Sequence, residues 1–426
     1  FLADWKTWKL DQVWSRPEDY FINSEANMLK LRYETGNALR ANPFLAGYLF
    51  CALTDSDFNG VGLTNLFREF KPGVIKLQDD LTAPLRWSLF VEPVNIYRNG
   101  TVNLDAVLSD IDVLKPGDHP VEIEVRAPDG KPVFKETISV TVPDPAVAGE
   151  PPLVRTVFQK DLAVTGPAGT YQFRARFTGD VKATGGQTDF RVFDPADMPV
   201  VDGEVVLWGS DPDLAQWLTD HGIRTRPYVP GDSKKRELIL VGSGGGDLAA
   251  FQDLARRMAT GSTVLFLSPA VFARDGQALG WLPLTTKGTY GPVDFYGGYY
   301  RGDTFGTGHA LFGSLPGKGV LDYTLYRNIL SHGGYGLMDS AVPDELIVGG
   351  IRAQFSYESN VQTAFYNFGE GKFLFNTLKL RESLGKDPLA ELLLRNLLNS
   401  AGEGLDKPAS DLPADFDQQL EAIGYQ

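Results

Sequence analysis

The sequence predicts a multidomain protein: an α/β segment, then an all-β sandwich, then a parallel α/β domain. Its 426 residues are too many for one ordinary hydrophobic core, because a domain holds roughly 100–200 residues. Short segments of alternating polarity fill residues 83–197, and apolar strands alternate with amphipathic helices after residue 203. Apolar residues make up 43% of the chain and charged residues 22%, so each region is expected to fold.

The charge balance argues against two classes of partner. The chain carries 40 Lys and Arg against 54 Asp and Glu, a net charge of −14 that repels nucleic-acid phosphates and anionic lipid headgroups. No run approaches the roughly 20 apolar residues of a membrane helix. We therefore expect neither nucleic acid nor a membrane as a partner. Phe1 follows neither an initiator Met nor a signal peptide, and we expect a longer polypeptide to precede it.

Cys51 is the single cysteine, so the chain can form neither an internal disulfide framework nor a cysteine-based zinc cluster. It lies in the apolar run GYLFCAL, which predicts a buried, unreactive thiol. Large proteins of oxidising compartments also manage without disulfides. The compartment stays open, with a periplasmic or secreted bacterial protein favoured.

Residues 1–82 are predicted to contain a helix followed by a buried strand. Helical spacing of apolar residues runs over 16–42, with Pro17 in the first turn and Pro43 just after the end. The run FLAGYLFCAL that follows is continuously apolar, as strands covered on both faces of a parallel sheet are. One helix and one such strand cannot make a core. The segment is therefore expected to be the end of a larger folding unit.

Polar side chains follow that strand in the loop TDSDFNG. Loops at the carboxyl ends of parallel strands collect functional groups, which makes this loop the first candidate site. Two carboxylates two residues apart can serve acid/base chemistry, bind sugar hydroxyls, or hold a hard cation together with an amide oxygen. A solvated turn rich in Asp, Asn and Gly is the structural alternative. The candidate residues are Thr54, Asp55, Asp57 and Asn59.

The middle and last regions have different patterns. About seven short strands separated by Gly, Pro and Asp turns predict an immunoglobulin-like β-sandwich over 83–197. The segment PADMPVVDG, residues 195–203, is expected to be a linker. Strands and amphipathic helices then predict a parallel sheet with crossover helices within 198–408, and 409–426 are expected to form a polar tail.

The glycine-rich segment VGSGGGDLAAF, residues 241–251, lies between an expected strand and an expected helix. Such a turn can hold a phosphate on backbone amides. Asp247 occupies the third glycine position of a dinucleotide fingerprint, and the Lys-Ser/Thr pair of a P-loop does not follow. A tight turn is favoured over a phosphate site, and no cofactor is expected.

The four histidines do not form a ligand pattern. No two of them are at metal-ligand spacing, so surface or capping roles are favoured and no metal is expected, while a site assembled from distant residues stays open. No GxSxG nucleophile elbow occurs either. The histidines are His119, His221, His309 and His332.

Two aromatic groups can stack on sugar rings or fill the protein interior. Trp5, Trp8 and Trp14 crowd the first 14 residues. Packing within a loop is the favoured role of the second group. Its members are Trp281, Tyr290, Phe295, Tyr296, Tyr299 and Tyr300.

Three segments of the first region form a family pattern: RPEDYF, ANPFLAGYLFCALTD and FNGVGLTNLFREFKP. The matching residues are Gly47 to Phe50, Asn59, Gly60, Arg68, Lys71 and Pro72. The pattern resembles the eighth strand and exit of the barrel in family 2 glycoside hydrolases, which implies that 1–82 are the C-terminal part of a (β/α)8 barrel. Many members carry an aromatic residue where this chain has Ala52-Leu53-Thr54, so the sugar stays undetermined.

The resemblance extends along the chain, because members of this family often continue into an immunoglobulin-like sandwich and some carry a domain similar to class I glutamine amidotransferases. The segment GKFLFNTLKLRESLGKDPLAELLLRNLL is similar to the closing strand, turn and helix of that domain. An amidotransferase-like fold is therefore implied for 198–408. Working amidotransferases need a Cys nucleophile after a strand, and the comparable strand end LFLSPAVF offers Ser268, which implies a catalytically inactive domain.

The resemblance implies a retaining β-glycosidase of β-galactoside or β-glucuronide type, which uses two carboxylates about 5 Å apart. Glu25 in FINSEANML is the candidate nucleophile within this chain, but it falls inside the predicted helix. Both catalytic glutamates are therefore expected upstream of Phe1, and the chain alone is expected to be inactive. Its part in the site would be substrate binding by the loop that contains Thr54, Asp55, Asp57 and Asn59.

The implied partners are a carbohydrate substrate and the upstream part of the same enzyme, with a homo-oligomer left open. The competing hypothesis is a noncatalytic carbohydrate-binding or oligomerisation protein. An active amidotransferase is disfavoured by the missing Cys nucleophile.

Overall fold

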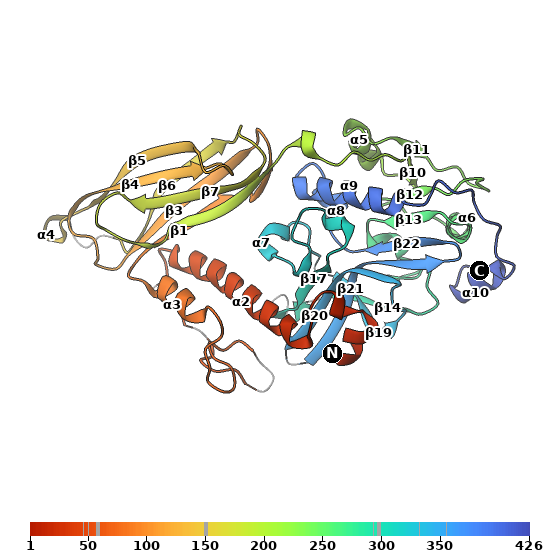
Figure 1. The fold of residues 1–426 in the computed structure, drawn as a ribbon, viewed down its shortest axis with the longest axis horizontal. Helices are drawn as coiled ribbons and strands as arrows, with labels where there is room; N and C mark the ends of the chain where they lie inside the picture. Colours follow the sequence, from red (N-terminus) through yellow and green to blue (C-terminus); the bar gives the residue numbers. More distant parts are fainter. Residues whose placement is uncertain are drawn as a thin grey trace. The chain divides into compact units, whose positions relative to one another are not determined.

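The computed structural model describes residues 1–45, 47–49, 51–56, 60–148, 152–292, 294–295, 300–331, 333–354 and 356–426. They form a mixed α/β protein with several sheets (Figure 1). The chain divides into two compact units, the first consisting of Phe1–Asn23 with Met198–Gln426 and the second of Ser24–Asp197. Residues 1–82, expected to share one domain, are thus divided between the two units after Asn23.

The second unit holds two sheets that enclose one hydrophobic core. The four-stranded sheet, in the order β6-β3-β1-β8, consists of β1 Leu85–Glu92, β3 Thr101–Asp110, β6 Val154–Ala163 and β8 Thr184–Gly185. The five-stranded sheet, in the order β2-β9-β7-β4-β5, consists of β2 Asn95–Tyr97, β4 Gly117–Arg126, β5 Pro132–Val142, β7 Gly169–Phe177 and β9 Gln187–Phe193. The short helices α4 Pro145–Ala148 and η2 Pro195–Asp197 lie in this unit.

Alternating polarity explains how these strands enclose a core. In β7, Tyr171, Phe173 and Ala175 are buried, whereas Arg174 and Arg176 are more exposed. Because successive side chains of a strand point to opposite faces, this pattern places one face of β7 on the core and the other toward solvent. Two sheets around a shared core are what the sequence predicts for this region.

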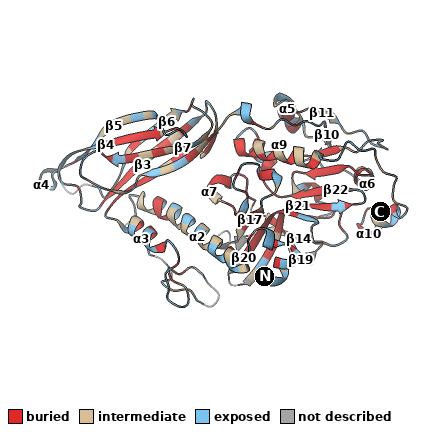
Figure 2. Ribbon diagram, viewed as in Figure 1, coloured by how far each residue is buried: buried red, intermediate tan, exposed pale blue. Residues whose placement is uncertain are grey.

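The helices α2 Pro17–Arg40 and α3 Val74–Thr82 lead into the sheets of the second unit. α2 confirms the helix predicted over 16–42. α3 buries Val74, Leu77 and Leu81. Figure 2 shows that buried residues concentrate in the strands, whereas α2 is mostly half-buried or exposed.

A buried arginine joins both helices to the four-stranded sheet. Arg86 on β1 is fully buried and donates to Asp80 Oδ2 of α3 and to Asn37 Oδ1 of α2, both at 2.9 Å. It also donates to Ser88 Oγ at 2.8 Å. A charged group is tolerated inside a protein only when its hydrogen bonds are satisfied. The Arg86 guanidinium therefore fixes both helices relative to β1.

The segment after α2 differs from the prediction. The described residues of 44–53 form no strand, and Phe44, Leu49 and Leu53 are 93%, 87% and 68% exposed. Cys51 is also exposed, so the predicted buried thiol is wrong. A strand covered on both faces needs neighbouring strands, and the described part of the chain supplies none here.

The first unit is built on one large mixed sheet. Its parallel strands, in the order β11-β10-β12-β13-β22, are β10 Val205–Trp208, β11 Thr225–Pro227, β12 Leu238–Val241, β13 Thr263–Phe266 and β22 Gly371–Asn376. Antiparallel strands continue it through β21 Ser356–Phe368, β20 Glu345–Gln354, β17 Asp303–Thr307 and β18 Lys318–Val320. β14 Lys287–Pro292 pairs with β19 Gly333–Ser340, and β15 Asp294–Phe295 pairs with β16 Tyr300–Arg301.

Helices precede, separate and follow the strands of this sheet along the chain. They are α1 Leu2–Thr7, η1 Leu10–Gln12, α5 Pro212–Asp220, α6 Leu248–Ala259, η3 Pro269–Phe272, η4 Ala310–Phe312, α7 Tyr323–Tyr326, α8 Leu380–Ser383, α9 Pro388–Gly402 and α10 Phe416–Ala422. Every residue of β12 and β13 is buried, as is common for parallel strands that are covered on both faces. Among the described helices, none combines the length and apolar character needed to cross a membrane.

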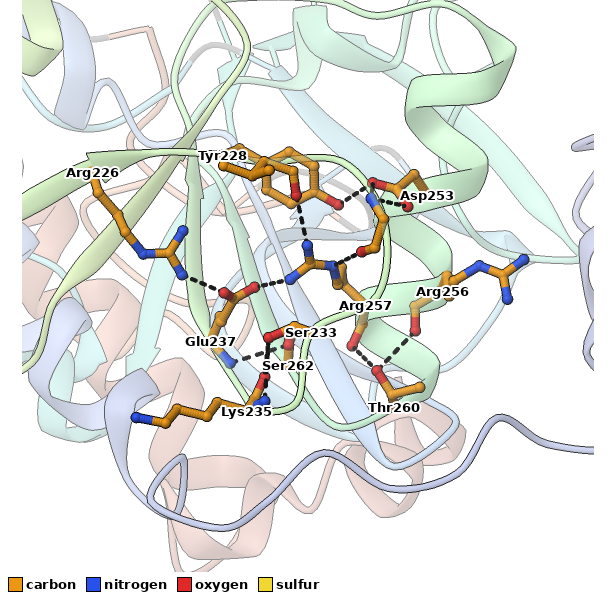
Figure 3. Close-up of polar contacts among 12 residues, drawn as sticks. Arg226, Tyr228, Ser233, Lys235, Glu237, Asp253, Arg256, Arg257, Thr260 and Ser262 are labelled. Carbon is orange, nitrogen blue, oxygen red and sulfur yellow. Dashed lines mark hydrogen bonds and ion pairs between the residues drawn. The ribbon is translucent and has the colours of Figure 1, made fainter.

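The connection from β11 to β12 contains no helix, and polar contacts hold it instead. Arg257 of α6 donates to Val229 O at 2.7 Å and to Gly231 O at 2.8 Å, and it pairs with Glu237 (Figure 3). The Arg257 guanidinium also lies over the ring of Tyr228, 5.0 Å from its centroid. Because Arg257 is buried, these contacts fix the connection on α6 without solvent competition.

The first 23 residues belong to the core of the first unit. Trp5, Trp8 and Trp14 are at most 8% exposed, which places them inside this core rather than along a sugar-binding cleft. Trp8 and Trp14 both contact the ring of Phe305 on β17, at 6.3 and 5.3 Å between ring centroids. The tryptophans therefore have the interior role that the sequence left open.

Residues 409–426 are not the polar tail that was expected. Phe416, Leu420 and Ile423 of this segment are buried, at the spacing of an apolar helical stripe. Tyr425 is 1% exposed, and its hydroxyl donates to Trp281 O. The C-terminal segment therefore packs into the core of the first unit.

Arg86→Ala is expected to lower the free energy of unfolding by about 3–5 kcal/mol, because it leaves Asp80 and Asn37 without their buried partner. Urea unfolding followed by circular dichroism measures the change. The matched control is Lys131→Ala, since the Lys131–Asp129 pair is 82% and 48% exposed and is expected to change the stability much less than Arg86 does. Equal losses in the two variants would contradict the assigned role of Arg86.

Candidate functional site

Two of the four predicted loop residues lie in the described part of the chain. Thr54 Oγ1 accepts a hydrogen bond from Thr64 Oγ1 at 3.1 Å, and Asp55 N donates to Thr64 O at 3.0 Å. These bonds draw the loop back on itself. Asp57 and Asn59 lie outside the described residues.

Asp55 forms a largely buried ion pair with Lys71. Its Oδ1 accepts from Lys71 Nζ at 2.9 Å and from Gly62 N at 2.7 Å, and Lys71 Nζ also donates to Gly60 O at 2.6 Å. The side chains of Lys71 and Asp55 are 3% and 14% exposed. A Cβ at Gly62 would lie 2.4 Å from Asp55 N, so this close approach requires glycine. The carboxylate is thus committed to holding the loop.

Glu25 on α2 lies within electrostatic reach of the same pair. Burial raises the pKa of the Glu25 carboxyl, the positive charge of Lys71 lowers it, and the negative charge of Asp55 raises it, with a net increase. Arg32, two turns further along α2, donates to Val61 O. The structure therefore gathers Glu25, Arg32, Asp55 and Lys71 into one charged cluster between α2 and the loop.

The described side chains of the cluster do not provide the two free carboxylates that retaining hydrolysis needs. A carboxyl group with a raised pKa is suited to proton donation, which Glu25 fits. Retaining hydrolysis needs a second free carboxylate about 5 Å away, and one oxygen of Asp55 is already held by Lys71 and Gly62. Sequence reasoning singled out Lys71 only through the family pattern and did not anticipate its pairing with Asp55.

The histidines have local structural roles. His309 Nδ1 accepts from Leu311 N at 2.9 Å at the start of η4, and His221 Nδ1 lies 2.7 Å from Trp217 O at the end of α5. His119 Nε2 lies 2.7 Å from Lys115 O, while His332 is outside the described residues. Within the described chain, no group of three or more His, Cys, Asp or Glu side chains is arranged to hold a metal.

The glycine-rich turn after β12 is closed by contacts with the loop after β10. A Cβ at Gly244 would lie 2.9 Å from Ser210 N, and one at Gly246 would lie 2.7 Å from the ring of Trp208. Asp247 caps α6 by accepting from Ala250 N. The glycines therefore serve close packing, which favours the tight-turn interpretation over a phosphate cradle.

Asp211 links the two loops at this edge of the sheet, beside a cavity of ≈310 Å³. Its carboxylate accepts from Arg381 Nη2 at 2.7 Å, Leu214 N at 3.1 Å and Ser243 N at 3.1 Å. Burial alone would raise the pKa of Asp211, but the hydrogen bonds and charge of Arg381 and the Leu214 amide outweigh it and lower the pKa to about 2. Both carboxylate oxygens of Asp211 therefore accept hydrogen bonds from groups within the protein.

Ser268 does not have the geometry of a nucleophile. It caps η3, and its Oγ accepts from Ala270 N at 3.3 Å. Pro269 follows directly, so a short 3-10 helix replaces the long helix of a nucleophile elbow. The Ser268 hydroxyl therefore caps the start of η3.

The second aromatic group is only partly described. Trp281 stacks on Phe251 at 4.7 Å between ring centroids and is buried, which makes it a core residue. Tyr290 is half-buried on β14. Tyr296 and Tyr299, and the side chains of Phe295 and Tyr300, lie outside what the structure describes.

Comparisons with known proteins identify no family: no family model and no curated protein matches the chain. Among solved structures, the alkylpurine DNA glycosylase AlkC of Pseudomonas fluorescens, bound to DNA containing an abasic site analog, is 16% identical, with a TM-score of 0.19 over 28% of this chain and 32% of that one. The CARDB domain of the PF1109 protein from Pyrococcus furiosus is 13% identical, with a TM-score of 0.19 over 26% and 86%. The sensor domain of the anti-sigma factor RsgI4 from Pseudobacteroides cellulosolvens is 9% identical, with a TM-score of 0.19 over 26% and 98%. At such TM-scores no inference about this chain follows.

Substitutions at Lys71 and Asp55 are expected to move the pKa of Glu25 in opposite directions. Lys71→Met removes the positive charge that lowers this pKa, so the pKa rises, whereas Asp55→Asn removes the negative charge that raises it, so the pKa falls. NMR titration of the Glu25 carboxyl measures both shifts. Lys76→Met, at an exposed position, is the control and should leave the pKa unchanged. Shifts of the same sign would rule out the cluster.

Arg381→Met is expected to make stability less dependent on pH in the acid range. Because the folded pKa of Asp211 is about 2, below its ordinary value, this carboxylate stabilises the fold above about pH 4 and the contribution is lost as pH falls toward 2. Without Arg381 the pKa returns upward, so stability near neutral pH drops and the slope between pH 4 and 2 becomes shallower. Urea unfolding at a series of pH values measures this, and an unchanged slope would contradict it.

Proposed function

We propose that this chain is the C-terminal portion of a retaining β-glycosidase that hydrolyses β-galactosides or β-glucuronides, with both catalytic glutamates in polypeptide that precedes Phe1. In this proposal residues 1–82 are the end of a (β/α)8 barrel, 83–197 an immunoglobulin-like sandwich and 198–408 a catalytically inactive amidotransferase-like domain. The family pattern in residues 16–72 is its starting point.

The observation that carries the proposal is the uncovered apolar surface formed by described residues between positions 44 and 75. Monomeric proteins rarely expose large apolar patches that have no partner. A segment composed like a doubly covered strand, yet exposed in this chain, supports a barrel whose other strands come from elsewhere. The exposed large apolar residues of this segment are Phe44, Leu45, Leu49, Leu53, Leu66, Phe67, Phe70 and Ile75.

The charged cluster supports a substrate-binding part for this chain. Lys71 holds Asp55 and the backbone at Gly60, the described residues on either side of the proposed substrate-binding residues Asp57 and Asn59. In a barrel the loop that contains these residues follows the eighth strand and borders the sugar site. Glu25 lies on a helix and not at a strand end, which favours catalytic carboxylates elsewhere.

The test joins the chain to the polypeptide that precedes it in the native protein. We expect this polypeptide to supply seven strands and two glutamates. The combined protein should hydrolyse a p-nitrophenyl β-galactoside or β-glucuronide with a kcat of the order of 1–10³ s⁻¹. NMR of the first sugar product should show retained anomeric configuration, and the chain alone should show no turnover.

An unrelated preceding sequence, or a combined protein without turnover, would contradict the glycosidase proposal. Glycan binding or self-association without turnover would instead support the noncatalytic carbohydrate-binding or oligomerisation protein.

A further inference from the structure

Residues 1–23, called the strap below, bury their aromatic side chains against strands that are about 300 residues distant in sequence. Trp8 and Trp14 pack on Phe305 of β17, which is itself fully buried. Tyr20 is 2% exposed and donates to Asp303 Oδ2 of the same strand at 3.1 Å. Each aromatic side chain of this size buries roughly 150–250 Å², so the strap contributes a substantial part of the local core.

Polar contacts anchor the strap at both of its ends. Near its start, Asp4 Oδ2 accepts from Ser359 Oγ at 2.7 Å and from the hydroxyl of Tyr357, both on β21. At its end, Asn23 Oδ1 accepts from Val320 N of β18 at 2.8 Å. Because these partly buried hydrogen bonds join specific residues at both ends of the strap, they hold the strap in one register.

The fit at the second anchor requires a glycine. Gly319 has φ +90, and a Cβ there would lie 2.7 Å from Asn23 Oδ1. Trp14 Nε1 donates to the same Asn23 oxygen at 3.1 Å. The backbone of β18 therefore fits closely around the Asn23 side chain of the strap.

We propose that the unit formed with Met198–Gln426 is a clamp that holds the strap and thereby positions the active-site segment joined to it. The positioning role rests on the proposed glycosidase function, in which the strap directly follows the barrel strand that carries the nucleophile. The clamp itself does not depend on that function. Holding the strap would be a role for this unit, in which Ser268 caps a short helix and the glycine-rich turn packs against its neighbours.

The clamp is tested in the 426-residue chain by hydrogen exchange and mass spectrometry. Asp4→Ala, and separately Trp14→Phe, should accelerate amide exchange in β17, β18 and β21, with at least a tenfold effect if about 1.4 kcal/mol of local stability is lost. The sandwich strand β4 should be unaffected. Lys6→Ala, an exposed position in the strap, is the matched control. Unchanged exchange in the three strands would overturn the clamp.

The positioning role is tested in the complete protein. Asp4→Ala should lower kcat by about tenfold or more while KM stays within about twofold, because a misplaced catalytic group loses rate more than binding. Lys6→Ala should leave both constants unchanged. An active enzyme whose kcat is unaffected by Asp4→Ala would overturn the positioning role and leave the glycosidase proposal intact. Accelerated exchange in a complete protein without turnover would overturn the glycosidase proposal and leave the clamp.

Discussion

A strand that is apolar on both faces is stable only between other strands, and residues 44–53 have that composition without such neighbours in the described chain. The surrounding elements are nevertheless firmly placed. Arg86 fixes α2 and α3 on the sheet, and the Lys71–Asp55 pair closes the following loop. An apolar segment that is uncovered between well-anchored neighbours has the character of an interface and not of an unfolded end.

The two units differ in how their polar side chains are used. Polar groups at the carboxyl edge of the parallel sheet are used internally: Asp211 binds Arg381, Ser268 caps a short helix, and the glycine-rich turn packs on Trp208. None of these groups is left available for chemistry in the way that Glu25 is. In the proposed function, the first unit has a supporting role and the loop beside the charged cluster on α2 contacts the substrate.

The sequence predicted most elements whose causes are local. Alternating polarity predicted strands of the second unit such as β7, the alternation of apolar strands with amphipathic helices predicted β12 and β13, and Pro17 with helical spacing predicted α2. The sequence did not predict features that depend on contacts with residues far away in the chain. Trp14 looks the same in sequence whether it lines a cleft or packs on Phe305, and the pairing of Lys71 with Asp55 depends on a loop that closes only in three dimensions. The polar composition of 409–426 likewise concealed the stripe that α10 buries.

The thiol of Cys51 reports directly on whether residues 44–53 become covered. Its rate of alkylation by iodoacetamide can be followed by mass spectrometry, with no competing cysteine in this chain. The thiol is exposed in the 426-residue chain and should react at the rate of a free cysteine. If these residues complete a barrel, the same thiol in the intact native protein should react at least tenfold more slowly, in line with about 1.4 kcal/mol or more of protection. Equal rates in the two would contradict the barrel and with it the glycosidase proposal.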